Sequence, residues 1–354
     1  MSDYKQALND LIVLVTKEGA SDLHLTAGRH PSLRVSGDLI PLVNKPPLTP
    51  EDTMGLVTEV LNTENKKLFL QNKEIDFSYA APNGVRFRGN AFFQRGFVGA
   101  ALRLITSQIR TLQELGLPER LADFARREQG FFLCVGPVGQ GKSTTLAALI
   151  HLINNERAEH IITIEDPVEY LFTNNKSIID QREVRFDTHD FAHALKAVFR
   201  QDVNVLMLGE MRSPETISTA VTAAETGHLV LSTLHTNSAS QTIDRIIDSF
   251  PANQQNQIRI QLAGSLLGIF SQRLLPRLSG GLVPAYELLI NNNAVANLVR
   301  EARTAEIDVV IETGLDEGMI TLNHSLAELV RSGDISQETA YRHSLNPKGL
   351  ERMI

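Results

Sequence analysis

A glycine-rich run from Gly136 to Ser143 has the residue types and spacing needed to hold a nucleotide phosphate. It follows the pattern G-x-x-x-x-G-K-S, in which glycines let the backbone curl so that its N–H groups point inward. Lys142 supplies a positive charge for the outer phosphates, and the hydroxyl of Ser143 can coordinate Mg²⁺. The run therefore predicts binding of ATP together with Mg²⁺. The predicted nucleotide-binding residues are Gly136, Pro137, Val138, Gly139, Gln140, Gly141, Lys142, Ser143 and Thr144.

Two carboxylates follow strand-like runs further along the chain. Glu165 directly follows residues 160–164, and Glu210 lies two positions after residues 203–208. The carboxyl ends of parallel strands meet at one edge of a sheet, where ligands bind. ATP hydrolysis needs Mg²⁺ and a positioned water molecule, and these carboxylates could supply both functions. Both are predicted catalytic residues, and Glu210 is also a predicted Mg²⁺ ligand, in part through water.

Other polar residues near these strand ends have a less specific pattern. Asp166 and Glu169 come after the first run, where each could act in catalysis or cap a helix. His235 follows the strand-like run 228–234, and we predict a catalytic role for it, with an ordinary loop histidine as the alternative. His228 begins the same run, and the odd spacing places it on the other face of an extended strand. The two histidines therefore cannot both reach one phosphate on an ideal strand.

Composition places the chain among ordinary soluble proteins. Its 354 residues carry a net charge of −7, which gives no global attraction to nucleic acid or to an anionic membrane. The single cysteine, Cys134, excludes a disulfide framework and suits a reducing compartment. Apolar runs are too short for a membrane-spanning helix, and the N-terminus lacks the layout of a secretory signal. We therefore expect a cytoplasmic protein with no transmembrane segment of its own.

The elements before residue 106 predict a small domain that combines helices with a sheet. Residues 4–19 have apolar positions at helical spacing, and residues 50–71 predict a second helix. Strands are predicted at residues 22–25, 32–35, 37–42, 75–79 and 85–93. We predict a domain over residues 1–105 and a linker over residues 106–118.

After residue 118, apolar runs alternate with helical patterns. Strands are predicted at residues 131–135, 160–164, 203–208 and 228–234, and helices at 143–154, 188–200 and 213–226. This alternation is typical of a parallel sheet covered by helices on both faces. Residues 253–275 predict a long helix and residues 282–290 a strand, with a helical remainder. Residues 119–354 are therefore predicted to form an α/β nucleotide-binding domain.

In the combination of these motifs the chain resembles the type IV pilus retraction ATPases, the PilT-like branch of the secretion ATPase superfamily. The resemblance extends through nearly the whole chain, and its motifs occur in the order of the family. They are ASDLHL at 20–25, RFRGNAF at 86–92, the Walker A loop at 136–143, TIEDPVEY at 163–170 (aspartate box), GEMR at 209–212 (atypical Walker B) and HLVLSTLHT at 228–236 (histidine box).

The resemblance implies an α/β fold with a RecA-like P-loop NTPase core and a smaller α+β, PAS-like N-terminal domain. It also implies a homo-hexameric ring, in which ATP lies between domains and receives arginines from the N-terminal domain. Arg88 and Arg103 match these arginine positions, whereas Arg86 and Arg95 match them less well. A guanidinium group stabilises charge on a transferring phosphoryl group, so Arg88 and Arg103 are predicted catalytic residues.

The function implied by the resemblance is a motor that hydrolyses ATP to power pilus retraction and twitching motility. It would act on an inner-membrane platform protein from the cytoplasmic face of the membrane. Glu165 would position water while Glu210 assists Mg²⁺, or these two roles are exchanged. One departure lies in the C-terminal signature at 294–301, where Ala296 replaces the first arginine of the family. Retraction is for this reason less directly indicated than ATP turnover.

Several alternative functions share the same core. An accessory retraction paralogue has the same motifs. Pilus assembly and type II secretion ATPases usually carry an additional N-terminal domain and a four-cysteine zinc insertion, which a single cysteine argues against. A RecA-like nucleic-acid translocase is disfavoured by the acidic balance. A non-catalytic nucleotide-binding regulator is disfavoured by the presence of Lys142, Glu165 and Glu210.

Overall fold

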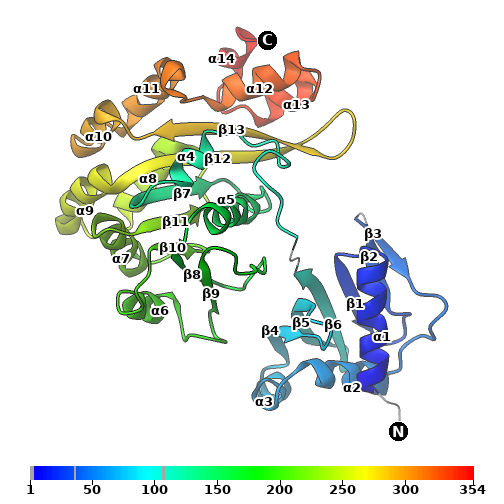
Figure 1. The fold of residues 1–354 in the computed structure, drawn as a ribbon. Helices are drawn as coiled ribbons and strands as arrows, with labels where there is room; N and C mark the ends of the chain where they lie inside the picture. The colour runs from blue at the N-terminus through cyan, green and yellow to red at the C-terminus, as the bar shows by residue number, and fades with distance from the viewer. Residues whose placement is uncertain (1–3, 36, 106–107) are drawn as a thin grey trace. The chain divides into compact units, whose positions relative to one another are not determined.

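The computed structural model describes residues 4–35, 37–105 and 108–354. The described chain divides into two compact units, residues 1–107 and residues 108–354 (Figure 1). This division falls inside the predicted linker, of which residues 106 and 107 lie outside the described residues. The later part of the predicted linker packs onto the second unit, because Leu112 and Leu117 are buried in one of its hydrophobic clusters.

The first unit is built on an antiparallel sheet. Its described strands lie in the order β3-β2-β1-β6-β5-β4. They are β1 (Asp22–Thr26), β2 (Ser32–Val35), β3 (Asp38–Pro41), β4 (Glu74–Ala80), β5 (Arg86–Gln94) and β6 (Phe97–Ile105). One face of the sheet, with Leu23 and Leu102, packs with α1 (Tyr4–Lys17) and α2 (Pro50–Val60) in a single apolar core. Alternate residues of the same strands therefore form a second, polar face.

The structure confirms the predicted helix and strands of this unit, with two differences. The helix predicted over residues 50–71 is two helices, α2 and α3 (Thr63–Asn72). The break follows from Asn62, whose side chain accepts a hydrogen bond from the N–H of Asn65 and begins the second helix. The second difference is β6, which no sequence pattern predicted although it lies between β1 and β5.

The second unit contains a mainly parallel sheet. Its described strands lie in the order β13-β12-β7-β11-β10-β8-β9. They are β7 (Gly130–Val135), β8 (His160–Glu165), β9 (Ile178–Glu183), β10 (Val205–Leu208), β11 (Leu229–Leu234), β12 (Leu266–Pro276) and β13 (Leu282–Ile290). Neighbours pair in parallel, except that β13 runs antiparallel to β12. The carboxyl ends of β7, β11, β10 and β8 therefore meet at one edge.

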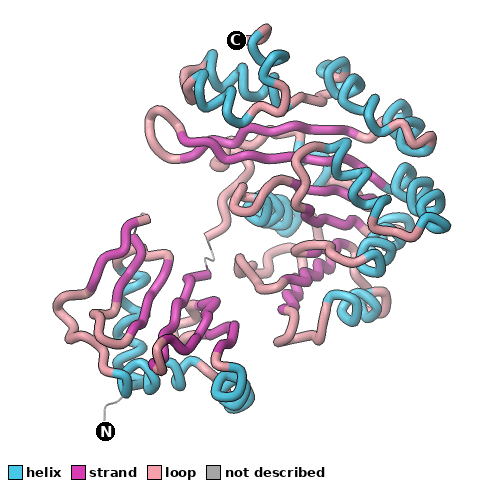
Figure 2. Tube along the Cα trace, turned by 180° about the vertical axis from the view of Figure 1, so that it is seen from behind, coloured by secondary structure: helices cyan, strands magenta, loops and turns pink. Residues whose placement is uncertain are grey.

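Helices cover both faces of this sheet (Figure 2). Phe131 and Leu133 of β7 belong to one hydrophobic cluster, and Phe132 and Cys134 to the cluster on the other face, which explains the continuous apolar strand. The helices are α4 (Leu121–Ala125), α5 (Lys142–Glu156), α6 (Phe191–Val198), α7 (Pro214–Glu225), α8 (Ala239–Asp248), α9 (Ala252–Ser265), α10 (Asn293–Arg300), α11 (Ile307–Thr313), α12 (Leu322–Arg331), α13 (Gln337–His343) and α14 (Pro347–Glu351). The predicted mixed α/β fold is confirmed.

The long helix predicted over residues 253–275 is wrong in its second half. α9 ends at Ser265, and β12 begins at the next residue. The segment from Leu266 to Ser271 pairs with β7 on one side, and β12 pairs along most of its length with β13 on the other. The apolar run therefore forms a strand between β7 and β13, and tertiary pairing overrides the local helical pattern.

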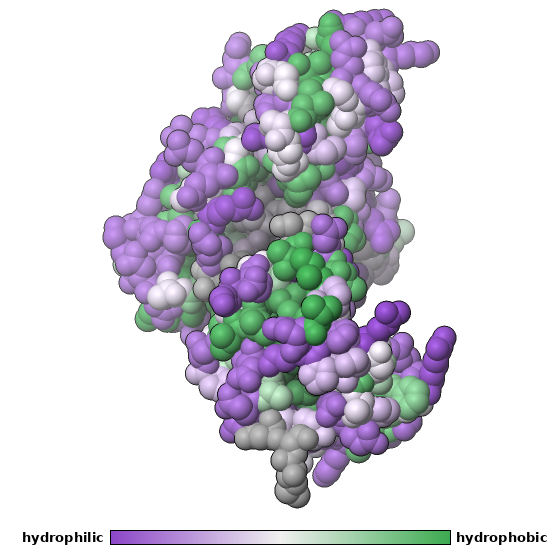
Figure 3. All heavy atoms as spheres, turned by 90° about the vertical axis from the view of Figure 1, so that its right-hand side faces the viewer, coloured by the Kyte–Doolittle hydropathy of each residue, from purple (hydrophilic) through white to green (hydrophobic). Residues whose placement is uncertain are grey.

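The exposed side chains include apolar as well as polar ones. The face shown in Figure 3 is mostly hydrophilic (purple), with groups of hydrophobic side chains (green) between the polar ones. The edge strand β3 exposes Leu39 and Ile40, and Val43 follows it. Within the described residues, no helix combines the length and the apolar character needed to cross a membrane.

Candidate active site

The phosphate-binding loop connects the end of β7 to the start of α5. Gly136, Gly139 and Gly141 have φ angles of 145°, 76° and 78°, a region that favours glycine. A Cβ atom at Gly136 would overlap the backbone oxygen of Gln272, and one at Gly141 would lie 3.0 Å from the side-chain amide nitrogen of the same residue. β12 therefore presses against the loop, and both glycines are needed for this close approach.

Side-chain hydrogen bonds hold the loop against β12. The hydroxyl of Thr145 donates to Oε1 of Gln272 at 2.6 Å. The N–H of Leu274 donates to Oε1 of Gln140 at 2.7 Å, so this predicted nucleotide-binding residue uses its side chain to shape the loop. No local pattern predicted Gln272 and Thr145, because position 272 falls in the run predicted as a helix and position 145 lies beyond the loop motif.

The N-terminus of α5 lies at the end of the loop. Its N-cap residue, Gly141, has no side chain that could accept from the first-turn N–H groups. These N–H groups, among them those of Ser143 and Thr144, suit an anion, which the helix dipole also attracts. The hydroxyl of Thr144 lies 2.7 Å from that of Tyr170, which ties this turn to the segment after β8. The side chain of Val138, by contrast, is exposed.

Lys142 is buried against the loop to which it belongs. Its Nζ donates to the backbone oxygens of Gly136 and Pro137, each at 2.8 Å, and lies 3.3 Å from Nδ1 of His235. Burial lowers the pKa of Lys142 below its ordinary value, and nearby acidic groups oppose that shift. The loop thus holds a cationic side chain inside its own curve.

His235 links the phosphate-binding loop to the strand end that carries Glu210. β11 lies between β7 and β10, so His235 at its end sits between Lys142 and Glu210. Since an ammonium group can only donate, Nδ1 of His235 accepts and Nε2 carries the proton. This Nε2 lies 3.7 Å from Oε2 of Glu210, whose Oε1 pairs with Nη2 of Arg212 at 2.6 Å. Burial and the charge of Lys142 lower the pKa of His235, which keeps the imidazole neutral near pH 7.

His228 lies at the other end of β11. Its Nδ1 is 3.0 Å from the backbone oxygen of Ala223, and its ring packs edge-on against Phe199. β11 runs from Leu229 to Leu234, so the two histidines flank opposite ends of one strand. The structure therefore places His235, and not His228, at the edge that holds the phosphate-binding loop.

The segment after β8 is a loop and not the start of a helix. Oδ2 of Asp166 pairs with Nη2 of Arg185 at 3.0 Å, and the N–H of Glu169 lies 3.3 Å from Oε2 of Glu165. In the described chain the next element after β8 is β9. The interpretation of Asp166 or Glu169 as a helix cap is therefore wrong.

Glu165 ends β8 with a buried carboxylate that accepts several hydrogen bonds. Oε1 accepts from the hydroxyl of Thr163 at 2.6 Å and from Nε2 of Gln181 at 3.4 Å. Burial raises the pKa of Glu165 to about 7, and these hydrogen bonds oppose the shift. A carboxyl group with this pKa suits a general base near neutral pH. Because folding raises this pKa, the protonated Glu165 contributes to the stability of the folded protein. This contribution is fully present below pH 4.5, the ordinary pKa of a glutamate, and is lost as the pH rises through about 7.

Turnover is expected to depend on the ionisation of Glu165. Replacing Thr163 by valine removes a hydrogen bond that favours the ionised carboxylate, so the pKa of Glu165 should rise further. The rising limb of kcat/KM, near pH 7 in the wild type, is then expected to move up by roughly one pH unit. Rates of phosphate release across the pH range would measure this shift.

A matched control is available in the first unit. Thr53 is also a fully buried threonine, and its hydroxyl donates to the backbone oxygen of Pro50. The Thr53→Val variant should therefore keep the wild-type pH profile. If the rising limb of kcat/KM does not shift in Thr163→Val, the pH dependence of turnover is not set by the ionisation of Glu165.

The predicted arginines lie in the first unit. Arg88 of β5 and Arg103 of β6 are opposite each other in register, and both side chains are exposed. Nε of Arg103 donates to Oδ1 of Asp22 at 2.8 Å. Arg86 starts β5 with its Nε buried, and Arg95 lies in the turn after β5 with φ of 51°. A role of these arginines in hydrolysis stays a prediction.

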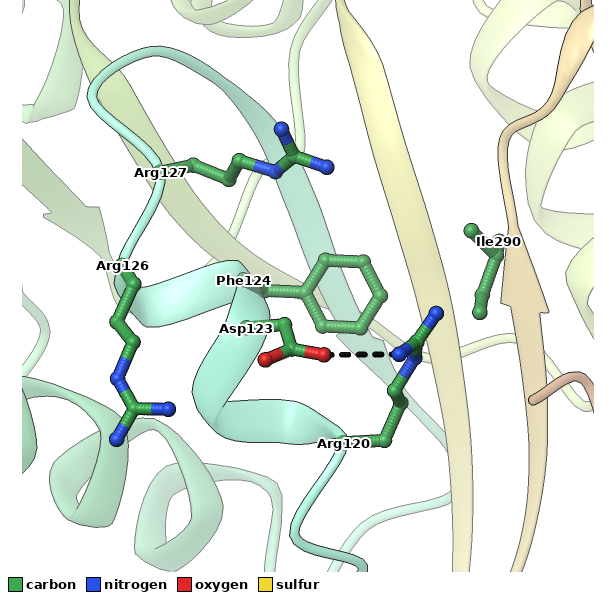
Figure 4. Close-up of a pocket in the computed structure, with 6 residues that line it drawn as sticks. All are labelled: Arg120, Asp123, Phe124, Arg126, Arg127 and Ile290. Atoms are coloured by element: carbon green, nitrogen blue, oxygen red, sulfur yellow. Dashed lines mark ion pairs between the residues drawn. The ribbon is translucent and has the colours of Figure 1, made fainter. Parts of the chain in front are cut away.

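A cavity of about 390 Å³ lies in the second unit away from the phosphate-binding loop. It is lined by Arg120, Asp123, Phe124, Arg126, Arg127 and Ile290 (Figure 4). Residues 120–127 precede β7, whereas the loop follows β7, so cavity and loop belong to opposite ends of this strand. Arg120 pairs with Asp123 at 3.1 Å and Arg126 with Glu156 at 2.9 Å. The cavity is therefore separate from the candidate active site.

Fold and site together define a P-loop ATPase built on a mainly parallel sheet. Residues 3–327 match the family described as "Type II/IV secretion system protein". The match covers most of the chain, and the chain belongs to this family.

The similar proteins are more specific. The chain is 43% identical over 341 residues to the "Type IV pilus retractation ATPase PilT" of Pseudomonas aeruginosa, covering 96% of this chain and 99% of the relative. It is 45% identical over 321 residues to a "Twitching motility protein" of Neisseria gonorrhoeae, covering 90% and 86%. A crystal structure of "the Pilus Retraction Motor PilT and Bound ADP" superposes with a TM-score of 0.91 at 47% identity, covering 97% of this chain and 98% of that chain.

Proposed function

We propose that this chain is an ATP-driven motor that powers the retraction of type IV pili and thereby twitching motility. The observation that carries the proposal is the order of polar groups along one edge of the second unit. Lys142, His235 and Glu210 come after β7, β11 and β10, and Glu165 ends β8; these four strands are adjacent in the sheet. The similarity to proteins named for pilus retraction and twitching motility over nearly the whole chain supports the same function.

The loop and α5 would bind the phosphates of ATP. Backbone N–H groups of the loop and of the first turn of α5 donate to the phosphate oxygens. The ammonium group of Lys142 provides positive charge for the outer phosphates. Gln272 of β12 stabilises the loop through its contacts with Gly136 and Thr145. The neutral His235 connects Lys142 to Glu210, so both groups are held in one chain of contacts.

Ser143 and Glu210 are the residues that would hold Mg²⁺. Mg²⁺ prefers oxygen ligands and keeps several waters, so one hydroxyl and one carboxylate suffice beside the phosphates. The described residues contain no cluster of three or more histidine, cysteine or acidic side chains placed to hold a metal. When bound, the ion neutralises negative charge on the phosphates.

Hydrolysis needs a base and stabilisation of the transferring phosphoryl group. Glu165 accepts a proton from the water whose oxygen attacks the γ-phosphorus, while the bond to the β-phosphate oxygen breaks and ADP leaves. Arg88 and Arg103 contribute positive charge to the phosphoryl oxygens. Glu210 is the alternative base if the two acidic roles are exchanged.

We further propose a homo-hexamer that acts on a platform protein at the cytoplasmic face of the inner membrane. Nucleic acid is not proposed as a partner, since the net charge of −7 gives no attraction to phosphate backbones. Ala296 of α10 is buried in the core of the second unit, where it serves packing.

Deletion of the gene, with pili counted by electron microscopy, tests the proposed function. We expect pili to accumulate and twitching to stop, because fibres would form without being disassembled. Complementation with the wild-type gene should restore twitching, whereas a gene encoding Lys142→Ala should not. Loss of pili would indicate an assembly ATPase, and unchanged pili would contradict both functions.

An accessory retraction ATPase is a second candidate. The chain is 42% identical over 345 residues to the "Type IV pilus ATPase PilU" of Pseudomonas aeruginosa, covering 97% of this chain and 90% of the relative. This identity is close to that with the retraction ATPase of the same organism. An accessory protein would restore twitching only in cells that contain a second retraction ATPase.

A further inference from the structure

One charged row crosses the polar face of the sheet in the first unit. Arg34 of β2, Asp22 of β1, Arg103 of β6 and Arg88 of β5 are register partners of one another in that order. Their side chains share one face, because partners in register point to the same side of a sheet. The row therefore places one carboxylate among three guanidinium groups.

Asp22 is a buried acid in this row. Its exposed fraction is 6%, although the arginines around it reach solvent. Oδ1 accepts from Nε of Arg103 at 2.8 Å, and Oδ2 accepts from the hydroxyl of Ser21 at 2.7 Å. Nε of Arg34 lies 4.0 Å from Oδ2. Both carboxylate oxygens thus have hydrogen-bond donors within the protein, and Arg103 and Arg34 compensate the negative charge.

Arg103 is anchored at one atom and exposed at the others. Its side chain is 69% exposed, yet its Nε is fixed by Asp22. A guanidinium group has five N–H donors in one plane, and the bond at Nε leaves the Nη1 and Nη2 groups for a second partner. Within the described residues these two groups have no protein partner. By contrast, Nη1 of Arg34 donates to the backbone oxygen of Gly37 at 2.7 Å.

This geometry is suited to binding a phosphate. Paired N–H groups of an arginine match two oxygens of a phosphate, and each such bond is charge-assisted. An arginine that is held in one orientation before the ligand arrives loses less rotamer freedom on binding. Asp22 supplies that restraint from a buried and therefore fixed position.

We propose that Asp22 is a positioning residue that orients Arg103 toward a phosphate group of the bound nucleotide during hydrolysis. The proposal rests on the proposed function, since it assumes that Arg103 acts in ATP turnover. It adds a role for the acid of the ASDLHL motif, which lies 81 residues from Arg103 in the sequence. The effect of Asp22 on turnover is exerted through Arg103 alone.

A double-mutant cycle on the full chain tests this role. Arg103→Ala is expected to lower kcat by roughly 1,000-fold or more, as for an arginine that stabilises a transferring phosphoryl group. Asp22→Asn keeps the shape of the side chain but removes its charge, and we expect a loss of about tenfold in kcat with nearly unchanged KM. The double variant should be no slower than Arg103→Ala, because Asp22 has no effect once its arginine is gone.

Two controls separate positioning from stability. Asp76 lies on the same polar face, where Oδ1 accepts from Nδ2 of Asn90 at 3.0 Å, and Asp76→Asn should retain wild-type kcat. Thermal midpoints of all variants report folding, and Asp22→Glu, which keeps the charge, should recover part of the lost kcat. If Asp22→Asn proves unstable, Asp22→Ser provides the same cycle with a smaller side chain.

The outcomes discriminate between the inference and the function on which it rests. A double variant that loses the product of the two single effects would show that Asp22 acts independently of Arg103, which overturns the inference. The inference is also overturned if Asp22→Asn lowers the thermal midpoint but keeps the wild-type kcat. It is likewise overturned if Arg103→Ala hydrolyses ATP at the wild-type rate. Neither of these results contradicts the ATPase function. A wild-type chain without Lys142-dependent hydrolysis would contradict the proposed function itself, and the inference with it.

Discussion

Replacing Lys142 by alanine is expected to abolish measurable binding of ATP. The ammonium group is the cation enclosed by the loop, with Nζ 2.8 Å from the backbone oxygens of Gly136 and Pro137. A hydrogen bond to a charged group contributes about 1.5–3 kcal/mol, so the loss of two such bonds to phosphate weakens binding by at least about 100-fold. Isothermal titration with ATP and Mg²⁺ would measure the change in Kd.

The same titration needs a lysine control. Lys176 is exposed in the second unit, and its Nζ lies 3.5 Å from the backbone oxygen of Glu156. Lys176→Ala should bind ATP as the wild type does. If Lys142→Ala also retained wild-type affinity, the loop would not be the nucleotide site.

Replacing Glu165 by glutamine is expected to stop turnover while ATP binding persists. The amide keeps the size of the side chain but cannot accept a proton from water, and a general base contributes about 10²–10⁴-fold to the rate. Glu210→Gln should also lower kcat, but in addition it should raise the Mg²⁺ concentration needed for half-maximal rate. Steady-state rates measured against ATP and against Mg²⁺ would separate these two effects.

The rates of Glu165→Gln and Glu210→Gln show which of the two residues is the general base and which binds Mg²⁺. Glu159 precedes β8 at the end opposite to Glu165 and pairs with Arg157, so Glu159→Gln serves as the control and should keep wild-type kcat. A Mg²⁺ requirement that shifts in Glu165→Gln, and not in Glu210→Gln, would exchange the two roles. Near-normal turnover in both variants would remove them from the active site.

The sequence was sufficient for the parts of the site that depend on local pattern. The loop from Gly136 to Ser143 and the strands that end at Glu165 and before Glu210 were predicted from glycine spacing and apolar runs. What it could not provide was the order of strands across the sheet. β11 enters between β7 and β10, and only this order places His235 between Lys142 and Glu210.

Contacts between distant residues were the other part that local pattern could not predict. Gln272 supports the loop from a strand whose residues also fit a helical pattern, and its role depends on pairing of β12 with β7. Asp22 and Arg103 meet because β6 pairs with β1, yet no pattern predicted β6. In both cases sheet pairing, which is a tertiary property, decided the outcome over local preference.

The close approach of Gln272 to the loop also has a mechanical consequence. Leu275, three residues further along β12, is buried in the cluster that holds α12 and α14. From Gln272 to Leu275 the strand is paired with β13, and close-packed interiors transmit displacement with little compression. The C-terminal half of β12 thus contacts the nucleotide loop through Gln272 and packs with the C-terminal helices through Leu275. We therefore expect a change in the shape of the loop to displace those helices.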